Sequence, residues 1–168
     1  MQPDFAAYER AARDRVTALD GEIDAETFAV AFNAFRLSTW LLQDFETNVY
    51  RPHGLSLAGF RLLFTLWTLG DLPPAEVARL AGVTKAAVSA SLNTLERDGL
   101  ASRIRSETDA RRVTVRLTAA GARRVEAVYR VQNERERELF RRFSRQELTA
   151  IASEMRALLS DHDPAPRE

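Results

Sequence analysis

Residues 75–100, AEVARLAGVTKAAVSASLNTLERDGL, decide the fold of this chain. A short amphipathic helix is expected to end at Leu80, and Gly82 can turn the chain directly after it. Thr84 can cap a second helix, and Gly99 can end it. Two short helices joined by a tight turn have the spacing of a helix-turn-helix, which is the motif that we predict here.

The second helix of this motif has two chemically different faces. Val88, Leu92 and Leu95 form one narrow apolar face at about 100° per residue. The opposite face carries small and polar side chains, namely Lys85, Ala86, Ser89, Ala90, Asn93 and Arg97. Such a face could enter a DNA major groove about 12 Å wide, where Ser89 and Asn93 could hydrogen-bond base edges and an alanine could touch a thymine methyl. The alternative is that these side chains face water, as half of any surface helix does.

The next stretch, residues 102–118 (SRIRSETDARRVTVRLT), has the alternation of two short strands. Ile104 lies between two arginines, and Val113, Val115 and Leu117 alternate with polar residues, so one side of each strand can face the helices. A small antiparallel wing is therefore expected beside the helix-turn-helix.

The tip of this wing, Glu107–Arg111, is polar and rich in charge. An arginine at such a tip can enter the narrow minor groove, where the negative potential is deepest. Asp109 would be repelled by phosphate. We therefore expect it to hold an arginine in place through a charge-assisted hydrogen bond, with Arg103 as the candidate.

Helices are also predicted on the N-terminal side of the motif. A short amphipathic leader helix lies within residues 1–20, and Gly21 breaks it. Asp24 can cap a long helix over residues 25–50, which ends before Pro52.

Two shorter helices then lead into the motif. Ser56 is the expected N-cap of the first, Gly70 its stop, and Trp67 a core residue on its apolar face. Pro73 and Pro74 open the second, because proline suits a first turn in which its missing N–H is not needed.

The C-terminal part is predicted to be helical as well. Thr118 can cap a long helix that runs to about Phe143 and links two regions. Ser144 and Glu147 have the spacing of a capping box for a last helix. This last helix carries an apolar stripe of Leu148, Ile151, Met155, Leu158 and Leu159.

Composition excludes several classes of protein. The chain has 168 residues, no cysteine and two distant histidines, so thiol chemistry is absent and a transition-metal site is not expected. No apolar run could cross a bilayer, and the acidic start is unlike a signal peptide. The sequence shows no glycine-rich phosphate loop, no nucleophile beside a base and no distinct carboxylate pair. We therefore predict neither an enzyme nor a cofactor.

The net charge of zero conceals a gradient along the chain. Residues 1–30 carry three arginines against seven acidic residues, a net charge of −4. Residues 79–116 carry eight basic residues against four acidic ones, a net charge of +4. Such segregation is typical of a nucleic-acid-binding face on an otherwise neutral protein, although a solvated surface can produce it too.

The run from Leu72 to Gly121 resembles the winged helix-turn-helix of the MarR family of bacterial transcriptional regulators, and the likeness extends over about residues 27–160. The most specific matches are LERDGL, Arg103, the Asp109-x-Arg111 pair and LTAAG. The resemblance implies that Ser89 and its neighbours read the major groove, that Arg111 enters the minor groove and that Asp109 positions the wing. Pro73 departs from the family by replacing a hydroxyl cap, and the leader helix is an addition found in some members.

The resemblance also implies a dimer in which the first and last long helices intertwine across a two-fold axis. The fold class is thus mainly α, a winged helix-turn-helix with a small antiparallel β wing and N- and C-terminal dimerisation helices. The expected divisions of one compact domain are a leader helix (1–22), a dimerisation region (23–55 and 118–161), a DNA-binding region (56–117) and a disordered tail (162–168).

A site for a small effector is predicted on the first long helix. Trp40 lies on its polar arc, one turn from Arg36 and from Asp44. By resemblance, effector pockets lie between the dimer helices and the reading head, so an arginine and an aromatic ring could grip a small aromatic anion. The candidate pocket residues are Asn33, Arg36, Trp40, Asp44 and His53. The alternative is that Trp40 packs on the leader helix or on a partner subunit while Arg36 covers its ring, and that His53 only pins a turn.

The sequence therefore predicts a cytoplasmic, sequence-specific regulator of transcription that binds double-stranded DNA, most simply a ligand-responsive homodimeric repressor on a pseudo-palindromic operator. The residues predicted to contact DNA are Thr84, Lys85, Ala86, Ser89, Ala90, Asn93, Arg97, Arg103, Arg105, Asp109, Arg111 and Arg112. Two alternatives stay open, namely a winged helix that binds another protein and a constitutive DNA binder without an effector.

Overall fold

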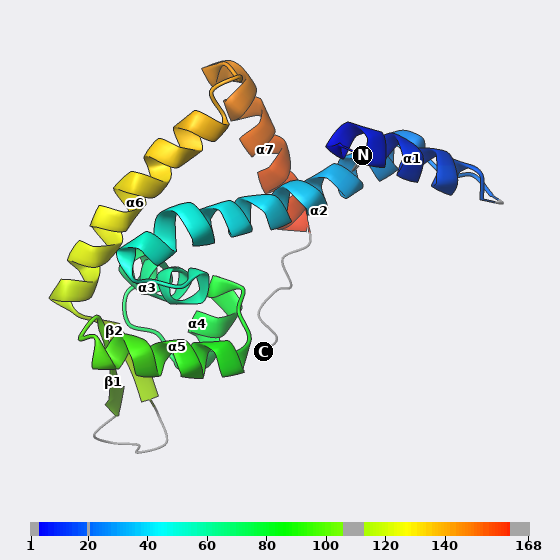
Figure 1. The fold of residues 1–168 in the computed structure, drawn as a ribbon. Helices are drawn as coiled ribbons and strands as arrows, with labels where there is room; N and C mark the ends of the chain where they lie inside the picture. Colours follow the sequence, from blue (N-terminus) through cyan, green and yellow to red (C-terminus); the bar gives the residue numbers. More distant parts are fainter. Residues whose placement is uncertain (1–3, 20, 106–112, 162–168) are drawn as a thin grey trace. The chain divides into compact units, whose positions relative to one another are not determined.

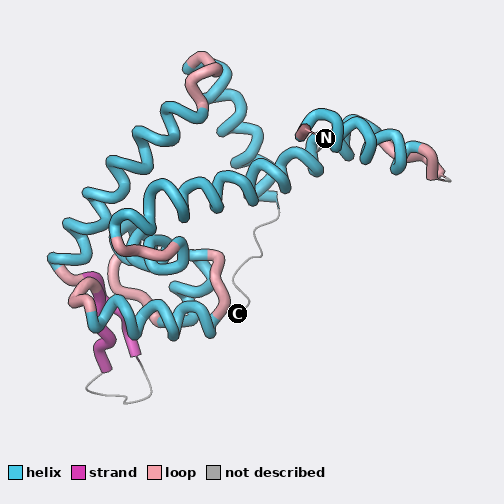
Figure 2. Tube along the Cα trace, viewed as in Figure 1, coloured by secondary structure: helices cyan, strands magenta, loops and turns pink. Residues whose placement is uncertain are grey.

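The computed structural model describes residues 4–19, 21–105 and 113–161. The chain divides into two compact units, residues 1–128 and 129–168. The elements, in chain order, are α1 (Phe5–Thr17), α2 (Ala25–Phe45), α3 (Leu57–Leu69), α4 (Pro74–Ala81), α5 (Lys85–Arg97), β1 (Ala101–Arg105), β2 (Val113–Leu117), α6 (Ala119–Leu139) and α7 (Arg145–Asp161) (Figure 1). The described chain is mainly helical with one two-stranded antiparallel sheet, as predicted (Figure 2).

The leader helix α1 packs along α2 through aromatic side chains. The Tyr8 ring meets the Phe32 ring edge-on with centroids 5.4 Å apart, and Phe32 in turn stacks on Phe28 at 5.1 Å. Near the other end of α1, Arg13 forms an ion pair with Glu26 at 2.5 Å. Helix α1 contains no buried residue, so these contacts with α2 are what positions it.

Helix α2 begins where the sequence predicts. One carboxylate oxygen of Asp24 accepts hydrogen bonds from the backbone N–H groups of Glu26 and Thr27, both at 2.9 Å. The predicted helix over residues 25–50 is confirmed in extent, but its hydrogen-bonding pattern changes. The α-helix ends at Phe45, and Glu46–Tyr50 form a π-helical turn. A 3-10 turn, Arg51–His53, follows.

The Asp24 cap gives α2 a pH dependence. The hydrogen bonds from Thr27 and Glu26 lower the pKa of Asp24 below its ordinary value, because they stabilise the charged carboxylate. A carboxylate with a lowered pKa in the folded state stabilises the fold above its ordinary pKa. That contribution is lost as the pH falls through the lowered value. We expect the amide resonances of Glu26 and Thr27 to titrate with a midpoint below about 3.9, the ordinary Asp pKa.

The matched control is Asp24→Asn, which keeps a capping oxygen but does not titrate, because an amide is not protonated in this pH range. In that variant the two amide resonances should no longer respond to the titration of residue 24. A midpoint at or above the ordinary pKa in the unmodified protein would contradict the cap.

The core of the first unit lies among α3, α4 and α5. The Ser56 hydroxyl caps α3 by accepting from the Gly59 N–H at 3.0 Å, as predicted. Phe60, Leu62, Leu63 and Leu66 of α3 are buried. Pro73 stands at the N-cap of α4 without a side-chain cap, and Pro74 opens the helix.

The prediction that Trp67 belongs to the core is wrong, because its side chain is 40% exposed. Phe60, which lies on the same stripe two turns earlier, is buried, whereas Trp67 lies in the last turn of α3, where Leu69 is 58% exposed as well. The Trp67 ring packs beside Phe64, with centroids 5.9 Å apart.

The wing pairs with more of the chain than its own hairpin. β1 and β2 are antiparallel, with Arg103 opposite Val115. Leu72 adds a short bridge to the outer side of β2, with Val115 donating its N–H to the Leu72 carbonyl at 2.8 Å. An ion pair between Arg116 and Asp71 at 2.6 Å reinforces the same edge. The segment before α4 thus holds the base of the wing.

The start of α6 packs against the segment that leads into β1. Thr118 caps α6 as predicted, accepting from the Gly121 N–H at 2.9 Å. Its own backbone N–H donates to the Leu100 carbonyl at 3.1 Å. A Cβ atom on Gly121 would lie 2.0 Å from that carbonyl oxygen, so only glycine fits there.

Helix α6 ends at Leu139, four residues before the predicted end at Phe143. Phe140–Phe143 instead form a turn, in which the Phe143 N–H donates to the Phe140 carbonyl at 3.0 Å. The predicted capping box then starts α7. Ser144 donates its backbone N–H to the Glu147 carboxylate at 2.7 Å, and the Glu147 N–H donates to the Ser144 hydroxyl at 3.3 Å.

The apolar stripe predicted on α7 lies at the surface of its unit, and Leu159 is 73% exposed. The predicted disordered tail, residues 162–168, lies outside the described residues. Among the residues that the structure describes, no helix is long and apolar enough to cross a membrane.

Candidate nucleic-acid interface

Helix α5 packs into the core through its apolar face, and its opposite face is exposed to solvent. Gly82 ends α4 in the left-handed conformation (φ +63°), and the Thr84 hydroxyl caps α5 by accepting from the Ala87 N–H at 3.1 Å. Val88, Leu92 and Leu95 are buried. The side chains on the opposite face, Lys85, Ala86, Ser89, Ala90, Asn93 and Arg97, are all exposed. The two faces therefore lie as the helical period predicts.

The wing stands directly beside this helix (Figure 2). Val115 of β2 is fully buried on the side of the helices, and Arg105 at the end of β1 is exposed. The tip residues predicted to contact DNA or to support that contact, namely Asp109, Arg111 and Arg112, lie outside the described residues.

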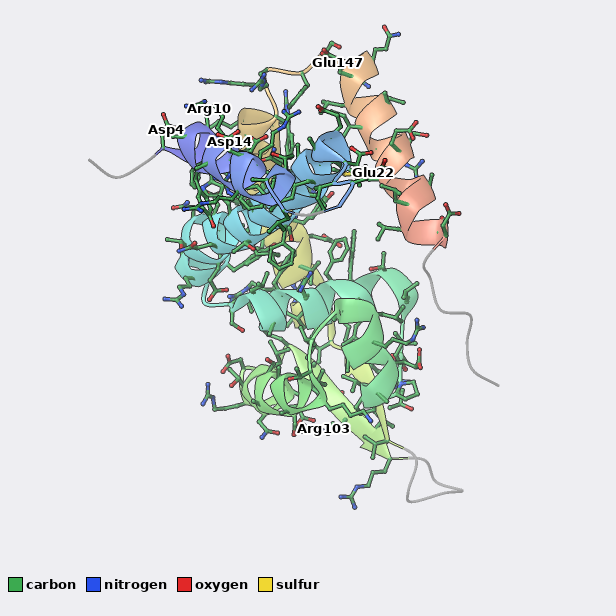
Figure 3. The ribbon with its side chains drawn as sticks, turned by 90° about the vertical axis from the view of Figure 1, so that its right-hand side faces the viewer. Asp4, Arg10, Asp14, Glu22, Arg103 and Glu147 are labelled. Atoms are coloured by element: carbon green, nitrogen blue, oxygen red, sulfur yellow. The ribbon has the colours of Figure 1, made fainter. Side chains whose placement is uncertain are left out.

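Arg103 ties the wing to α5. Its backbone N–H donates to one carboxylate oxygen of Glu96 at 2.7 Å, and its guanidinium forms an ion pair with the other oxygen. The same guanidinium donates to the Asn93 side-chain oxygen at 3.0 Å and to the Ser89 carbonyl at 3.4 Å. Figure 3 shows Arg103 at the junction of the strand and the helix. The wing and the reading face of α5 are thereby joined by one side chain.

Glu96 belongs to the candidate interface through its contacts with Arg103, and the sequence analysis missed it. Asp109, the partner predicted for Arg103, is not among the described residues, and the described carboxylate at Arg103 is Glu96. One signal could have indicated it. Glu96 follows Asn93 by three residues, which places both on adjacent turns of one helix face. The register that brings β1 alongside is a tertiary feature and has no such local signal.

Basic groups surround the start of α5. Lys85 is its first residue and is exposed, and it lines a groove of about 410 Å³ together with Ser89 and Arg103. The Arg61 guanidinium of α3 lies over the turn before α5, 3.8 Å from where a Cβ atom on Gly82 would be. Within residues 4–19, 21–105 and 113–161, no carboxylate forms an ion pair with Arg61. The sequence analysis did not predict Arg61, because the rest of its helix is mostly apolar and indicates a core helix.

Of the candidate pocket residues, Arg36 is held by the leader helix. Its guanidinium lies over the rings of Phe5, Tyr8 and Phe32 at 4.7, 5.4 and 5.2 Å, and it donates to the Phe5 carbonyl at 3.1 Å. The described cation–π contacts of Arg36 are thus with these rings and not with Trp40, which is 40% exposed.

The remaining pocket candidates differ in their surroundings. Asn33 is exposed, and Asp44 accepts from the Asn48 amide at 2.8 Å. The His53 ring nitrogen Nδ1 lies 2.7 Å from the Val49 carbonyl, and the His53 carbonyl accepts from Arg124 at 2.7 Å. These contacts hold His53 in the turn after α2, and its place in an effector pocket stays a prediction.

Comparisons with known proteins agree with this architecture. A MarR family model matches residues 53–112. YwaE of Bacillus subtilis (strain 168), an uncharacterised HTH-type transcriptional regulator, is 28% identical over 80% of this chain and 78% of its own. The HTH-type transcriptional repressor YetL of the same organism is 33% identical over 62% of this chain and 63% of its own.

Solved structures share the fold. The regulator BldR from Sulfolobus solfataricus superposes with a TM-score of 0.72 at 21% identity over 81% of this chain and 96% of its own. A mutant MarR from E. coli complexed with operator DNA superposes with a TM-score of 0.65 at 22% identity, over 79% of this chain and 97% of its own. NadR in complex with 4-hydroxyphenylacetate superposes with a TM-score of 0.65 at 20% identity, over 84% of this chain and 96% of its own.

A helix-turn-helix with a two-stranded wing joined to its second helix defines a winged helix-turn-helix protein. Within that class, the curated relatives are HTH-type regulators of transcription. Residues 53–112 are thus similar to the MarR family of transcriptional regulators.

Proposed function

We propose that this protein is a homodimeric repressor that binds a pseudo-palindromic operator in double-stranded DNA and releases it when a small aromatic anion binds. The observation that carries the proposal is the exposed Ser/Ala/Asn face of α5, tied through Arg103 to the wing beside it. YetL is named a repressor, and a similar MarR was solved on operator DNA. A protein that acts on the chromosome of a bacterium works in the cytoplasm, where we place it.

In this proposal α5 enters the major groove. Ser89 and Asn93 reach base edges there, and Ala86 and Ala90 lie close enough for contact with thymine methyls. The small side chains matter, because they let the helix backbone approach the floor of the groove. Thr84, whose oxygen caps the helix, still has its hydroxyl proton to donate to a phosphate.

Basic side chains on either side of α5 hold the phosphates. We assign this role to Lys85, Arg97 and Arg105, and we add Arg61 because it lies against the turn before α5. Arg97 is the weakest of these candidates, since Asp98 lies 3.3 Å away and neutralises part of its charge. At the wing tip, Arg111 enters the minor groove, Arg112 contacts the backbone and Asp109 positions the tip, as the resemblance implies.

Exposed apolar surface on the long helices supports the dimer. On α2, Phe35 is 79% exposed and Val30 and Leu37 are also at the surface. On α7, considered by itself, Leu158 and Leu159 are exposed as well. Exposed apolar side chains at this density mark interaction surfaces. The regions 23–55 and 118–161 are therefore the proposed dimerisation region, and residues 56–117 the DNA-binding region. Two reading heads on a two-fold axis match two half-sites.

The proposed effector is a small aromatic acid that binds near Trp40. NadR was solved with 4-hydroxyphenylacetate, and the DNA binding of a further similar protein, BpsR of Bordetella bronchiseptica, is regulated by 6-hydroxynicotinic acid. On this chain, Trp40 offers a partly exposed ring between Arg36 and Asp44 on successive turns of α2, with Asn33 on the same helix. A ligand that favours one spacing of the two reading heads would break simultaneous contact with both half-sites.

The test begins with selection of bound sequences from random duplexes, followed by titration of the winning operator complex with aromatic acids. We expect an acid to displace DNA from the unmodified protein and Trp40→Ala to abolish that response while leaving operator affinity within about threefold. Trp67→Ala is the matched control, because Trp67 has the same 40% exposure on α3. A response that survives Trp40→Ala, or that Trp67→Ala removes instead, contradicts the pocket placement. Failure of every duplex to bind in dilute buffer contradicts the function.

A further inference from the structure

Asn93 and Arg103 contact each other on the outward face of α5. A guanidinium nitrogen of Arg103 (Nη1) lies 3.0 Å from the Asn93 side-chain oxygen (Oδ1). A guanidinium has five N–H donors and no acceptor, so only the oxygen end of the amide can face it. The amide orientation of Asn93 is therefore set by its partner, with the NH2 group as the end that Arg103 does not hold.

Arg103 is itself fixed in position. The two carboxylate oxygens of Glu96 bind different parts of it, one the backbone N–H at 2.7 Å and the other the guanidinium. The Arg103 and Glu96 side chains are each only 30% exposed, and the Ser89 carbonyl adds a further acceptor at 3.4 Å. Charge-assisted hydrogen bonds of this kind are stronger than neutral ones and directional. The arginine that orients Asn93 is thus pre-organised before any DNA is bound.

We propose that Asn93 reads its base as a hydrogen-bond donor only, and that Arg103 and Glu96 impose this specificity as positioning residues. The inference rests on the proposed reading role of α5. An unconstrained asparagine pairs with adenine through two bonds, donating to N7 and accepting from the N6 amine. The second bond needs Oδ1, where Arg103 already uses one of the two lone pairs and places a positive charge beside the other. The approach of an adenine or cytosine amine to that oxygen is therefore disfavoured.

Guanine suits the constrained amide better than adenine does. Its major-groove edge presents two acceptors, N7 and O6, and no donor. The outward NH2 group of Asn93 can donate to either of them, and the nearby guanidinium favours the same electronegative edge. At the base pair that Asn93 faces, we therefore expect guanine to bind about 10-fold better than adenine.

The experiment measures relative affinity for the selected operator and its three single-base replacements at each position of a half-site. Asn93→Ala first identifies the base pair that Asn93 contacts, because all four bases should then bind equally well at that position of the half-site. Arg103→Met then removes the guanidinium but keeps an unbranched side chain. We expect it to release Oδ1 and to shift the guanine-to-adenine ratio about 10-fold toward adenine at that position. Glu96→Gln weakens the hold on Arg103 and should shift the ratio in the same direction, which gives a second readout if Arg103→Met does not fold.

Arg105→Met is the matched control, because Arg105 is an exposed arginine two residues further along β1. It should weaken binding to all sequences and leave the ratio unchanged. Adenine preferred by the unmodified protein at the Asn93 position would overturn the assignment, as would a ratio that neither Arg103→Met nor Glu96→Gln changes. Asn93→Ala with no effect at any one position would instead overturn the reading role of Asn93 in the proposed function.

Discussion

Operator affinity is expected to fall by about 10³- to 10⁵-fold as the salt concentration rises from 50 to 200 mM, the range for about 6 to 10 phosphate contacts. The physical reason is counterion release, because each basic group that neutralises a phosphate frees a condensed cation. Each subunit offers five candidate phosphate contacts, with Arg111 as a further cation in the minor groove, and a dimer doubles them. The five are Arg61, Lys85, Arg97, Arg105 and Arg112. The measurement is the slope of log affinity against log salt concentration, by fluorescence anisotropy on a labelled operator.

Two variants separate the phosphate contacts from the rest of the surface. Arg111→Ala should weaken binding to all sequences and reduce the slope by about 2 in a dimer, since one contact contributes about 0.9. Arg167→Ala, near the end of the chain, should leave both affinity and slope unchanged. A flat salt dependence together with full tolerance of Arg111→Ala would indicate a winged helix that binds another protein.

Gly121→Ala is expected to lower the free energy of unfolding by about 3 kcal/mol, at the upper end of the usual cost of overpacking. Elsewhere in a helix this substitution stabilises, because alanine has the higher helix propensity by about 1 kcal/mol. Here the new methyl group would lie 2.0 Å from the Leu100 carbonyl oxygen and 2.7 Å from a methyl of Leu117. The carbonyl belongs to the backbone and also accepts from Thr118, so it cannot move without loss of that hydrogen bond.

The measurement is urea unfolding followed by circular dichroism, with all variants at one protein concentration because a dimer is stabilised by association. The control is Ala120→Gly at the preceding, exposed position of α6, which should cost about 1 kcal/mol through propensity alone. A Gly121→Ala variant that is as stable as the unmodified protein would show that α6 can move away from Leu100. The prediction also explains the glycine in the LTAAG motif by close packing.

Local signals in the sequence predicted the helix starts. Asp24, Ser56, Thr84 and Thr118 each cap the helix that was assigned to them, and Ser144 forms its box with Glu147. Every one of these interactions joins residues two or three positions apart, so its geometry follows from the helix itself. The same reasoning holds for the two faces of α5, which depend only on the helical period.

Predictions that depended on which surface meets which were less successful. Trp67 has the spacing of a core residue and shares a stripe with the buried Phe60, yet the last turn of α3 is left exposed. Helix α6 was extended through Phe143 because nothing in its local pattern marks a stop at Leu139. The assignment of Arg36 to an effector pocket stays a prediction, and no local signal indicated its contacts with Phe5 of the leader helix.

The sequence by itself predicted a winged helix-turn-helix, because caps, periodicity and strand alternation are short-range properties. Only the tertiary structure decided how the reading face is organised. Glu96, Arg103 and Asn93 meet because β1 runs alongside α5, and Arg61 reaches the turn at Gly82 because α3 packs across α4. Those contacts join residues 7 to 21 positions apart through packing between elements, and no local propensity specifies such packing.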